Sequence, residues 1–436
     1  MRVFFINGNP YKPAVPPIGL EYVCEATLNA GHEATIYDFS LMEETGLETA
    51  VRTFSPDVIG ITLRNMDTGH LFNNVSYIPE LKKLIAGIKI YFKGPIVLGG
   101  AGFSLLPEEI LRTVEADYGV IGEGDVYFPQ LLENLSHPEN VPNIVIRNRT
   151  TQTITATKKE TLKHCPPQLK RGTVDHSNYY KMFSKYPGHS LANIQTKRGC
   201  NKSCTYCAEP DVIGRTIIKR DPNDIVSEIK EFIKKGIVDQ FFFVDSEFNV
   251  CPDHAAEVCE ALLANNIQIR WSCYLTPENT DKRLISLMNR AGCENMFWSM
   301  ESASDPVLQG LGKNYNAADV MRITNTCDEL NQTYTILLMF GGPDETEHTV
   351  KETWENLRNA KNANFGIVTG VRIYPSTQMA QTALKDGIIA SENELLAPTF
   401  YRKEYTINVI FPAVEKHFGS MKNCVILGPE RKTKFN

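Results

Sequence analysis

Three cysteines lie close together in the segment RGCNKSCTYCAEP, residues 198–210. Cys200, Cys204 and Cys207 can supply thiolates, which bind zinc and iron–sulfur clusters. A structural zinc site takes four ligands, but no histidine lies within ten residues of these cysteines, and the nearest other cysteines are Cys165 and Cys251. A [4Fe-4S] cluster held by three thiolates leaves one iron open to a ligand that is not protein. We therefore expect such a cluster at these cysteines, with a zinc site completed from a distance as the alternative.

The cysteines follow the first of six segments that have the composition of β-strands. These segments are residues 192–199, 240–247, 269–275, 295–302, 333–342 and 367–375, and each gap between them has apolar residues at helical spacing. Six βα units predict a partial (β/α)6 barrel, whose functional residues lie on the loops that follow the strands. We expect this barrel to span residues 191–390, followed by a C-terminal extension of weak pattern at 391–436.

A separate alternation of strands and helices precedes the barrel, in residues 1–147. Its strand candidates are residues 2–6, 33–38, 57–62, 95–100 and 118–123, and helical patterns cover residues 18–31, 76–89 and 107–114. This βαβ order predicts an α/β domain with a parallel sheet and helices on both faces. Residues 148–190 lose the pattern, so we expect a linker there. An open parallel sheet binds ligands at the carboxyl ends of its strands, where the loops are rich in glycine.

The overall composition limits the partners and the compartment. The net charge is −6 and the pI is about 5.9, so the chain offers no general basic surface for a nucleic acid or an anionic membrane. No uninterrupted apolar stretch has membrane-spanning length, and the N-terminus lacks a signal-peptide core. Eleven cysteines in 436 residues are too sparse and uneven for a disulfide scaffold. We expect a cytoplasmic protein with no membrane partner.

The C-x-x-x-C-x-x-C motif with Tyr206 before its last cysteine resembles the radical S-adenosylmethionine (SAM) superfamily. The segments FFFVDSEFN, FWSMESASDPVLQGLGK, LLMFGGPDETEHTVKET and VRIYPSTQMAQTALKDGII follow in the order seen in that superfamily. The resemblance implies that SAM binds the open iron and that a reducing partner such as flavodoxin or ferredoxin supplies the electron that cleaves SAM. It also implies that Glu301 binds the SAM ribose, with Ser299 as its companion. Further cofactor contacts implied at the strand ends are Asp245, Ser246, Gly341, Arg372 and Tyr206.

The N-terminal segments PPIGLEY, GGAGFSLLPEE and IGEGD resemble the Rossmann-like (flavodoxin-like) cobalamin-binding domain that precedes the barrel in one large class of radical SAM enzymes. By this resemblance the glycine-rich loops would line the cobalamin groove at Gly99, Gly100, Gly102, Gly122, Glu123 and Gly124. The D-x-H-x-x-G signature that supplies a histidine to cobalt is absent. The residues facing cobalt would instead be Thr62, Leu63, Arg64 and Asn65, and a cation at Arg64 would disfavour an axial water.

These resemblances imply a cobalamin-dependent radical SAM methyltransferase that moves a methyl group from methylcobalamin to an unactivated carbon, after a 5'-deoxyadenosyl radical has activated the substrate. The substrate would be a small molecule or a peptide. A cyclase or ring-rearranging enzyme without methyl transfer is the first alternative. The cysteine loop also resembles that of methylthiotransferases, but only Cys24 precedes residue 165, so the second cluster of those enzymes cannot form. A cobalamin-binding module with an inactive barrel is the last alternative.

Overall fold

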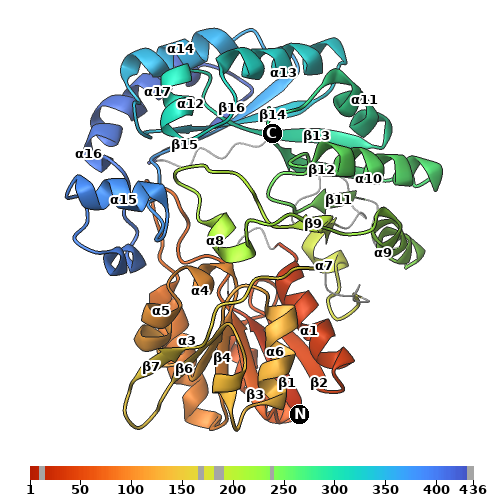
Figure 1. Ribbon diagram of the computed structural model, residues 1–436, viewed down its shortest axis with the longest axis vertical. Coiled ribbons are helices and arrows are strands. Elements are labelled where there is room, and N and C mark those ends of the chain that lie inside the picture. The colour runs from red at the N-terminus through yellow and green to blue at the C-terminus, as the bar shows by residue number, and fades with distance from the viewer. Residues whose placement is uncertain (9–14, 165–170, 181–190, 236–239, 430–436) are drawn as a thin grey trace.

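Two sheets, one from each half of the chain, organise the computed structural model, which describes residues 1–8, 15–164, 171–180, 191–235 and 240–429 (Figure 1). Of the linker expected at residues 148–190, residues 165–170 and 181–190 lie outside this description. Among the described residues, no helix is both long enough and apolar enough to cross a membrane.

The N-terminal sheet has the strand order β2-β1-β3-β4-β5-β6-β7. Its strands are β1 (Arg2–Asn7), β2 (Glu33–Asp38), β3 (Val58–Thr62), β4 (Ile96–Gly99), β5 (Tyr118–Val120), β6 (Ile144–Arg147) and β7 (Ile154–Ala156). The first five are parallel in the flavodoxin order, which confirms the predicted fold. The sheet is nevertheless mixed, because β6 and β7 add to its edge in antiparallel pairing. Strand β7 lies in the stretch that we expected to be linker.

Helices cover both faces of the N-terminal sheet, because alternate strand residues point to opposite sides. Val3 and Phe5 pack with α1 (Ile18–Asn29) and α6 (Gly124–Glu133). Phe4 and Ile6 pack in the core on the other face, which is covered by the remaining long helices. The other helices of this half are η1 (Glu44–Gly46), α2 (Leu47–Phe54), α3 (Ile78–Tyr91), α4 (Ala101–Leu105), α5 (Pro107–Val114), η2 (Pro138–Asn140) and, between the two sheets, α7 (Ser177–Tyr180).

The second sheet is parallel throughout, in the order β16-β15-β14-β13-β12-β11-β8. Its strands are β8 (Leu191–Ile194), β11 (Gln240–Phe243), β12 (Arg270–Leu275), β13 (Cys293–Glu301), β14 (Tyr334–Phe340), β15 (Ala363–Thr369) and β16 (Cys424–Leu427). Six of them are the predicted barrel strands. The seventh, β16, comes from the extension in which the sequence showed little pattern, so that extension is part of the sheet.

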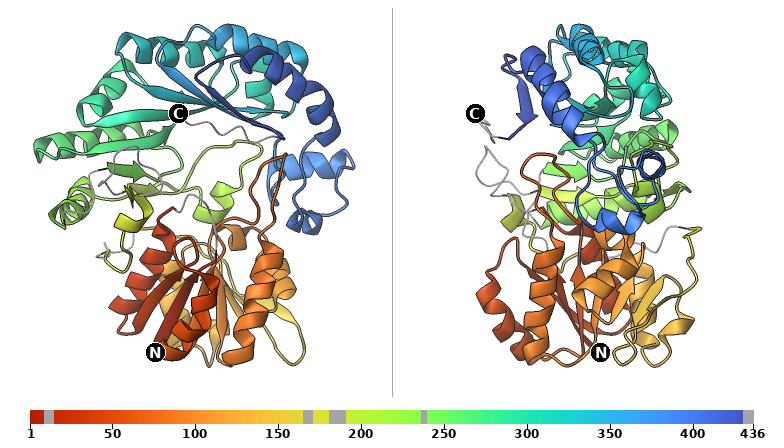
Figure 2. Two further views of the ribbon diagram at one scale, coloured as in Figure 1. Left: turned by 180° about the vertical axis from the view of Figure 1, so that it is seen from behind. Right: turned by 90° about the vertical axis from the view of Figure 1, so that its left-hand side faces the viewer.

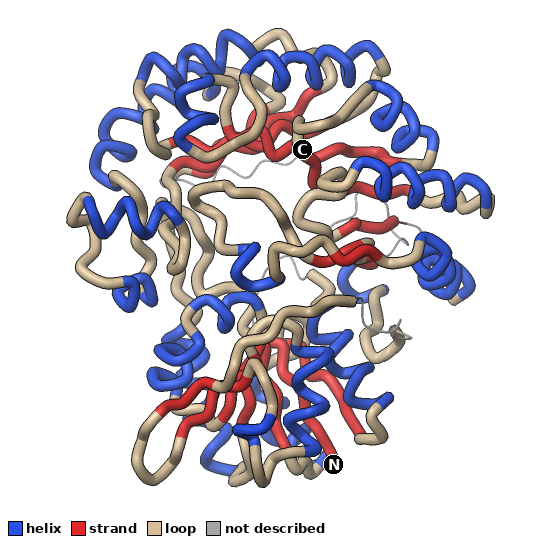
Figure 3. Tube along the Cα trace, in the orientation of Figure 1, coloured by secondary structure: helices blue, strands red, loops and turns tan. Residues whose placement is uncertain are grey.

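Helices lie on the outer side of this curved sheet (Figures 2 and 3). Asp221 caps α9 (Pro222–Lys234), where its carboxylate accepts a hydrogen bond from the Asn223 amide at 2.8 Å, and Pro222 occupies the first turn. The helices of this half are α8 (Glu209–Ile213), α9 (Pro222–Lys234), α10 (Pro252–Ala264), α11 (Lys282–Arg290), α12 (Asp305–Gly310), α13 (Ala317–Glu329), α14 (Glu347–Leu357), α15 (Gln378–Lys385), η3 (Glu392–Leu396), α16 (Lys403–Tyr405), the π-helix η4 (Thr406–Ile410) and α17 (Phe411–Phe418).

Candidate functional site

A short hairpin holds the three-cysteine segment, which we call the cluster loop (residues 199–214). Strands β9 (Lys197–Arg198) and β10 (Ile218–Lys219) pair in antiparallel register just outside it. Gly199 has φ +87°, and a Cβ there would lie 2.0 Å from the Thr216 carbonyl oxygen, so only glycine fits. The Cys200 amide donates to the Gly214 carbonyl at 3.0 Å. The backbone therefore fixes where the first cysteine begins the loop.

The cysteine thiols are protonated in the metal-free chain. Burial raises the pKa of Cys200 to about 11 and that of Cys207 to about 12, and it also raises the pKa of Cys204. Metal binding must therefore release protons from these thiols. Within the described part of the chain, no three Cys, His, Asp or Glu side chains converge on one metal ion. A four-iron cluster takes each thiolate on a different iron and needs no such convergence, whereas the zinc alternative does.

A carboxylate, a phenol and an ammonium group meet beside the cluster loop. Strand β13 ends at Glu301, which has φ +59° and follows a register shift against β14. The Tyr206 hydroxyl donates to Glu301 Oε1 at 2.8 Å, and Lys313 Nζ lies 3.2 Å from Oε1 and 3.0 Å from the Tyr206 oxygen. Ser299, on the same strand, contributes its backbone carbonyl, which accepts a hydrogen bond from the Tyr315 hydroxyl at 2.9 Å. The structure thus brings Tyr206, Glu301 and Lys313 together at the end of β13.

Two charged residues of this region were not singled out in the sequence. Lys313 ends the segment FWSMESASDPVLQGLGK; its buried ammonium hydrogen-bonds to the Cys204 thiol, and it keeps a pKa well above the usual value because the Tyr206 and Glu301 oxygens outweigh the cost of burial. Glu247 follows directly after Asp245 and Ser246, which the sequence implied as cofactor contacts. Burial raises its pKa to about 7, and its Oε2 has no hydrogen-bond partner among the described residues. Both side chains line a small cavity with Cys204.

Asp245 and Ser246, two of the residues expected to bind cofactor from the strand ends, contact other residues of the second half of the chain. Asp245 accepts hydrogen bonds from the Thr196 amide at 2.8 Å and hydroxyl, and its carboxylate pairs with the buried Lys197 ammonium at 2.9 Å. These contacts occupy both carboxylate oxygens. Ser246 hydrogen-bonds to the carboxyl group of Glu209, two residues beyond the last cysteine, and so contacts the cluster loop.

Gly341 and Arg372, two more of the expected cofactor contacts, lie against other parts of the chain. Gly341 has φ +97°, and a Cβ there would lie 2.8 Å from the Thr406 side chain, so the space beside it is filled by the chain itself. Arg372 lies beyond the end of β15. Its buried guanidinium pairs with Asp67 at 3.0 Å and donates to the Leu395 carbonyl at 2.7 Å, so it links the two halves of the chain.

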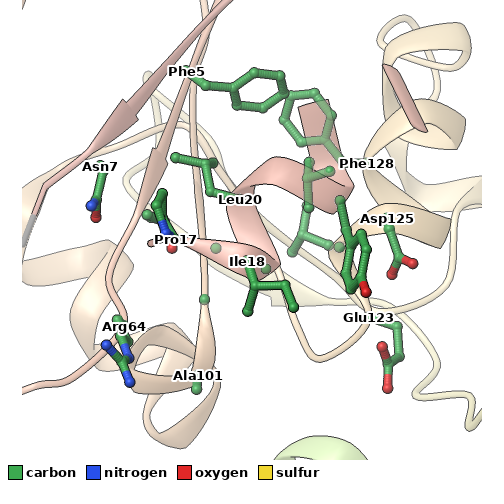
Figure 4. Close-up of a pocket in the computed structure, with 18 of the residues that line it drawn as sticks. Phe5, Asn7, Pro17, Ile18, Leu20, Arg64, Ala101, Glu123, Asp125 and Phe128 are labelled. Carbon is green, nitrogen blue, oxygen red and sulfur yellow. The ribbon is translucent and has the colours of Figure 1, made fainter. Parts of the chain in front are cut away.

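A cavity of about 360 Å³ lies where the two halves meet (Figure 4). Of the residues expected to line a cobalamin groove, the cavity wall includes Thr62, Arg64, Gly99, Gly100, Gly122, Glu123 and Gly124. The barrel half contributes Asn193, Gln195, Arg198, Val212, Ile213 and Val244. A Cβ on Gly99 would meet nothing closer than 3.8 Å, so the glycine leaves open space on the cavity side.

Three other expected groove residues do not reach this cavity. Leu63 is 2% exposed and packs in the core under the sheet, because successive side chains of this segment alternate in direction. Asn65 lies against Gly102, where a Cβ would approach the Asn65 backbone within 2.7–2.9 Å. Gly102 therefore allows α4 to pack on the preceding loop and does not border the ligand space. Arg64, by contrast, is exposed and lines the cavity.

Buried arginines connect the two halves around this cavity. Arg198, two residues before Cys200, pairs with Glu123 and, through two nitrogens at 2.7 and 3.0 Å, with Asp125. Arg171 pairs with Glu21 of α1 at 2.6 Å and with Glu228 of α9 at 2.9 Å. These ion pairs thus join the first half of the chain to the second.

Comparisons with known proteins agree with this geometry. The radical SAM superfamily matches residues 194–371, and the B12 binding domain matches residues 6–132. The chain is 23% identical to a tryptophan 2-C-methyltransferase of Streptomyces laurentii, over 88% of this chain and 75% of the relative. It is 26% identical to an anaerobic magnesium-protoporphyrin IX monomethyl ester cyclase of Synechocystis sp., over 72% of this chain and 63% of the relative. The fold matches the radical SAM methyltransferase TsrM of Kitasatospora setae, solved with tryptophan and a SAM analogue, with a TM-score of 0.86, 21% identity and coverage of 99% of this chain and 91% of that one.

Proposed function

We propose that this chain, which joins a B12-binding domain to a domain of the radical SAM superfamily, is a cobalamin-dependent radical SAM methyltransferase. Its substrate would be an unactivated carbon of a small molecule or a peptide. The observation that supports this most directly is the interdomain cavity, because its wall includes both the glycine-rich loops of the first domain and residues on either side of the three cysteines. A methyl carrier in that cavity would lie against the loop that holds the cluster.

The residues around the cavity suit cobalamin. Gly99 leaves the sheet edge without a side chain, and a Cβ there would meet nothing closer than 3.8 Å, so a large ligand can approach the backbone. Cobalamin carries carboxamide groups at its periphery, which donate hydrogen bonds to carboxylates such as Glu123 and Asp125. No histidine lines the cavity among the described residues, so cobalt would keep its lower face without a protein imidazole. Arg64 is an exposed cation of the cavity wall, whereas Arg198 is already paired with Glu123 and Asp125.

The residues at the barrel end suit SAM and a cluster. Cys200, Cys204 and Cys207 would hold three irons, and the Glu301 carboxylate, oriented by Tyr206, would accept hydrogen bonds from the SAM ribose. When bound, cobalamin would supply the methyl group, and the cluster with SAM would supply the radical that activates the substrate carbon. A one-electron reductant such as flavodoxin or ferredoxin would be required.

Methyl transfer is tested with protein purified without oxygen. Iron and cobalt content and the ultraviolet–visible spectrum establish whether both cofactors are present. Incubation with SAM that carries a deuterated methyl group, a reductant and candidate substrates then follows the label. Label in the product supports the proposal. Absence of iron, or failure to cleave SAM in cofactor-loaded protein, would contradict it.

Cyclisation is a second candidate, because the chain is similar to the Synechocystis cyclase over 72% of its length. That enzyme class would consume SAM without moving its methyl group. Deoxyadenosine that forms together with an altered product without the methyl label would favour cyclisation over methyl transfer.

A further inference from the structure

We propose that Arg198 couples the interdomain cavity to the cluster loop, so that cobalamin in the cavity and a cluster on the three cysteines strengthen each other's binding. This inference rests on the proposed function, because it concerns the two cofactors named there. Arg198 is a positioning residue in this scheme: it contacts the wall of one site and continues in the chain directly to a ligand of the other.

The Arg198 side chain is held by several polar contacts, two of which reach the first domain. Its side chain is 9% exposed, and it forms a two-nitrogen interaction with Asp125, whose side chain is 5% exposed, together with an ion pair to Glu123. Its Nε donates to Gln195 Oε1 at 3.1 Å. Planar two-point pairing between a guanidinium and a carboxylate fixes orientation as well as distance. Glu123 and Asp125 lie at the start of α6 in the first domain, so the contact crosses between domains.

The same residues form part of the cavity wall. Arg198, Glu123 and Asp125 all line the cavity, and so do Val212 and Ile213, which follow the last cysteine. A Cβ at Gly122 would lie 3.2 Å from the Val212 carbonyl oxygen, so the two walls are in close contact. Residues that line the cavity therefore stand on both sides of the three cysteines in the chain, Arg198 just before the cluster loop and Val212 and Ile213 within it. A ligand that orders this wall must also restrict the cluster loop.

The path from Arg198 to Cys200 is short and rigid. Arg198 ends β9, which pairs with β10, and Gly199 is held so tightly against Thr216 that no side chain fits. The Cys200 amide is fixed to the Gly214 carbonyl at 3.0 Å. A shift of the Arg198 backbone is therefore passed directly to the first cysteine.

Two carboxylates share the one guanidinium, which leaves the trio with one excess negative charge when both are ionised. Hydrogen bonds from the carboxamides of cobalamin would stabilise that charge and hold the acidic pair in place. An ordered pair fixes Arg198, which preorganises the cluster loop. By thermodynamic reciprocity, a cluster that orders the loop must raise the affinity for cobalamin by the same factor.

The test compares hydroxocobalamin affinity with and without the cluster. Absorbance titrations without oxygen are run on cluster-loaded wild type and on a variant in which Cys200, Cys204 and Cys207 are all changed to alanine. We expect the cluster-loaded protein to bind hydroxocobalamin at least about fivefold more tightly. The same comparison is made in Arg198→Gln, with the cluster and with the three cysteines changed to alanine. There the ratio of the two affinities should fall to about one, and Arg198→Lys should restore part of it.

A second readout is the electron paramagnetic resonance spectrum of the reduced cluster. Hydroxocobalamin would itself take electrons from the reduced cluster. The spectrum is therefore recorded without cobalamin and with cobalamin that has already been reduced to its diamagnetic cobalt(I) state. The signal should shift in wild type and stay unchanged in Arg198→Gln. Arg149→Gln is the matched control: Arg149 pairs with Asp117 at 2.5 Å in the same domain, and neither residue lines the cavity. It should leave both readouts as in wild type.

The outcomes separate this inference from the proposed function. If wild type binds no cobalamin or holds no iron, the proposed function fails. If it binds both, but with the same cobalamin affinity in the presence and absence of the cluster, the proposed function stands and the coupling is refuted. An unchanged ratio in Arg198→Gln refutes the role of this residue. If Arg198→Gln does not fold, Asp125→Asn, which leaves the Glu123 pair in place, must lower the ratio, and an unchanged ratio there overturns the proposal.

Discussion

Removal of the Arg171 guanidinium should destabilise the protein strongly, because it leaves a buried carboxylate poorly compensated. The Arg171 and Glu21 side chains are each 1% exposed, and their nearest nitrogen and oxygen are 2.6 Å apart. In Arg171→Met, Glu228 keeps Arg220 at 2.7 Å, but among the described residues Glu21 keeps only His176, at 3.2 Å. Breaking a buried ion pair from one side costs about 3–5 kcal/mol. We expect a loss of that size in the free energy of unfolding.

The double variant Arg171→Met with Glu21→Met distinguishes the cause. Replacing both members of a buried pair by apolar residues is often neutral or stabilising, so the double variant should recover at least half of the loss. Urea unfolding followed by circular dichroism measures all the variants. Arg52→Met is the control, because Arg52 and Glu48 form an exposed pair on α2 with side chains 61% and 54% exposed, and such a pair contributes about 0.3–0.5 kcal/mol. A double variant as unstable as Arg171→Met would refute the reasoning.

Four further predictions concern the site and its support. Cys204→Ala should lower the iron content and abolish SAM cleavage; zinc in place of iron in the wild type would contradict the cluster. Tyr206→Phe removes a hydrogen bond to Glu301 and should weaken SAM binding about 2- to 10-fold in equilibrium dialysis, whereas an unchanged Kd would leave Tyr206 without that role. Burial raises the pKa of Glu345 from 4.5 to about 7. The neutral acid is therefore favoured in the folded state, and its contribution to stability is complete below pH 4.5 and lost by about pH 7. Wild type should lose about 3 kcal/mol relative to Glu345→Gln across that window, and parallel stability curves would exclude this. In cobalamin-loaded protein, Arg64→Ala should change the axial coordination of cobalt, and identical spectra would remove Arg64 from the cobalt environment.

The strands could be predicted from the sequence because their residues carry the signal locally. In β1, Val3 and Phe5 pack on one face and Phe4 and Ile6 on the other, so the run RVFFI has to be a strand buried on both sides. Strand β16 could not be found in this way. Its side chains are only partly buried at the sheet edge, and it pairs with β15, more than fifty residues earlier in the chain.

The sequence by itself determined the α/β order of the two halves and the position of the cluster loop, because the alternation of strand and helix patterns and the spacing of the cysteines are local features of the chain. Only the tertiary structure decided which side chains face the cavity and which serve the fold. Asp245 and Arg372 stand at positions where a cofactor ligand was expected. In the structure Asp245 forms a buried ion pair with Lys197, and Arg372 forms one with Asp67, which is distant in the chain. The physical reason is that a buried charge takes whichever opposite charge the packing brings near it, and sequence spacing does not record that proximity.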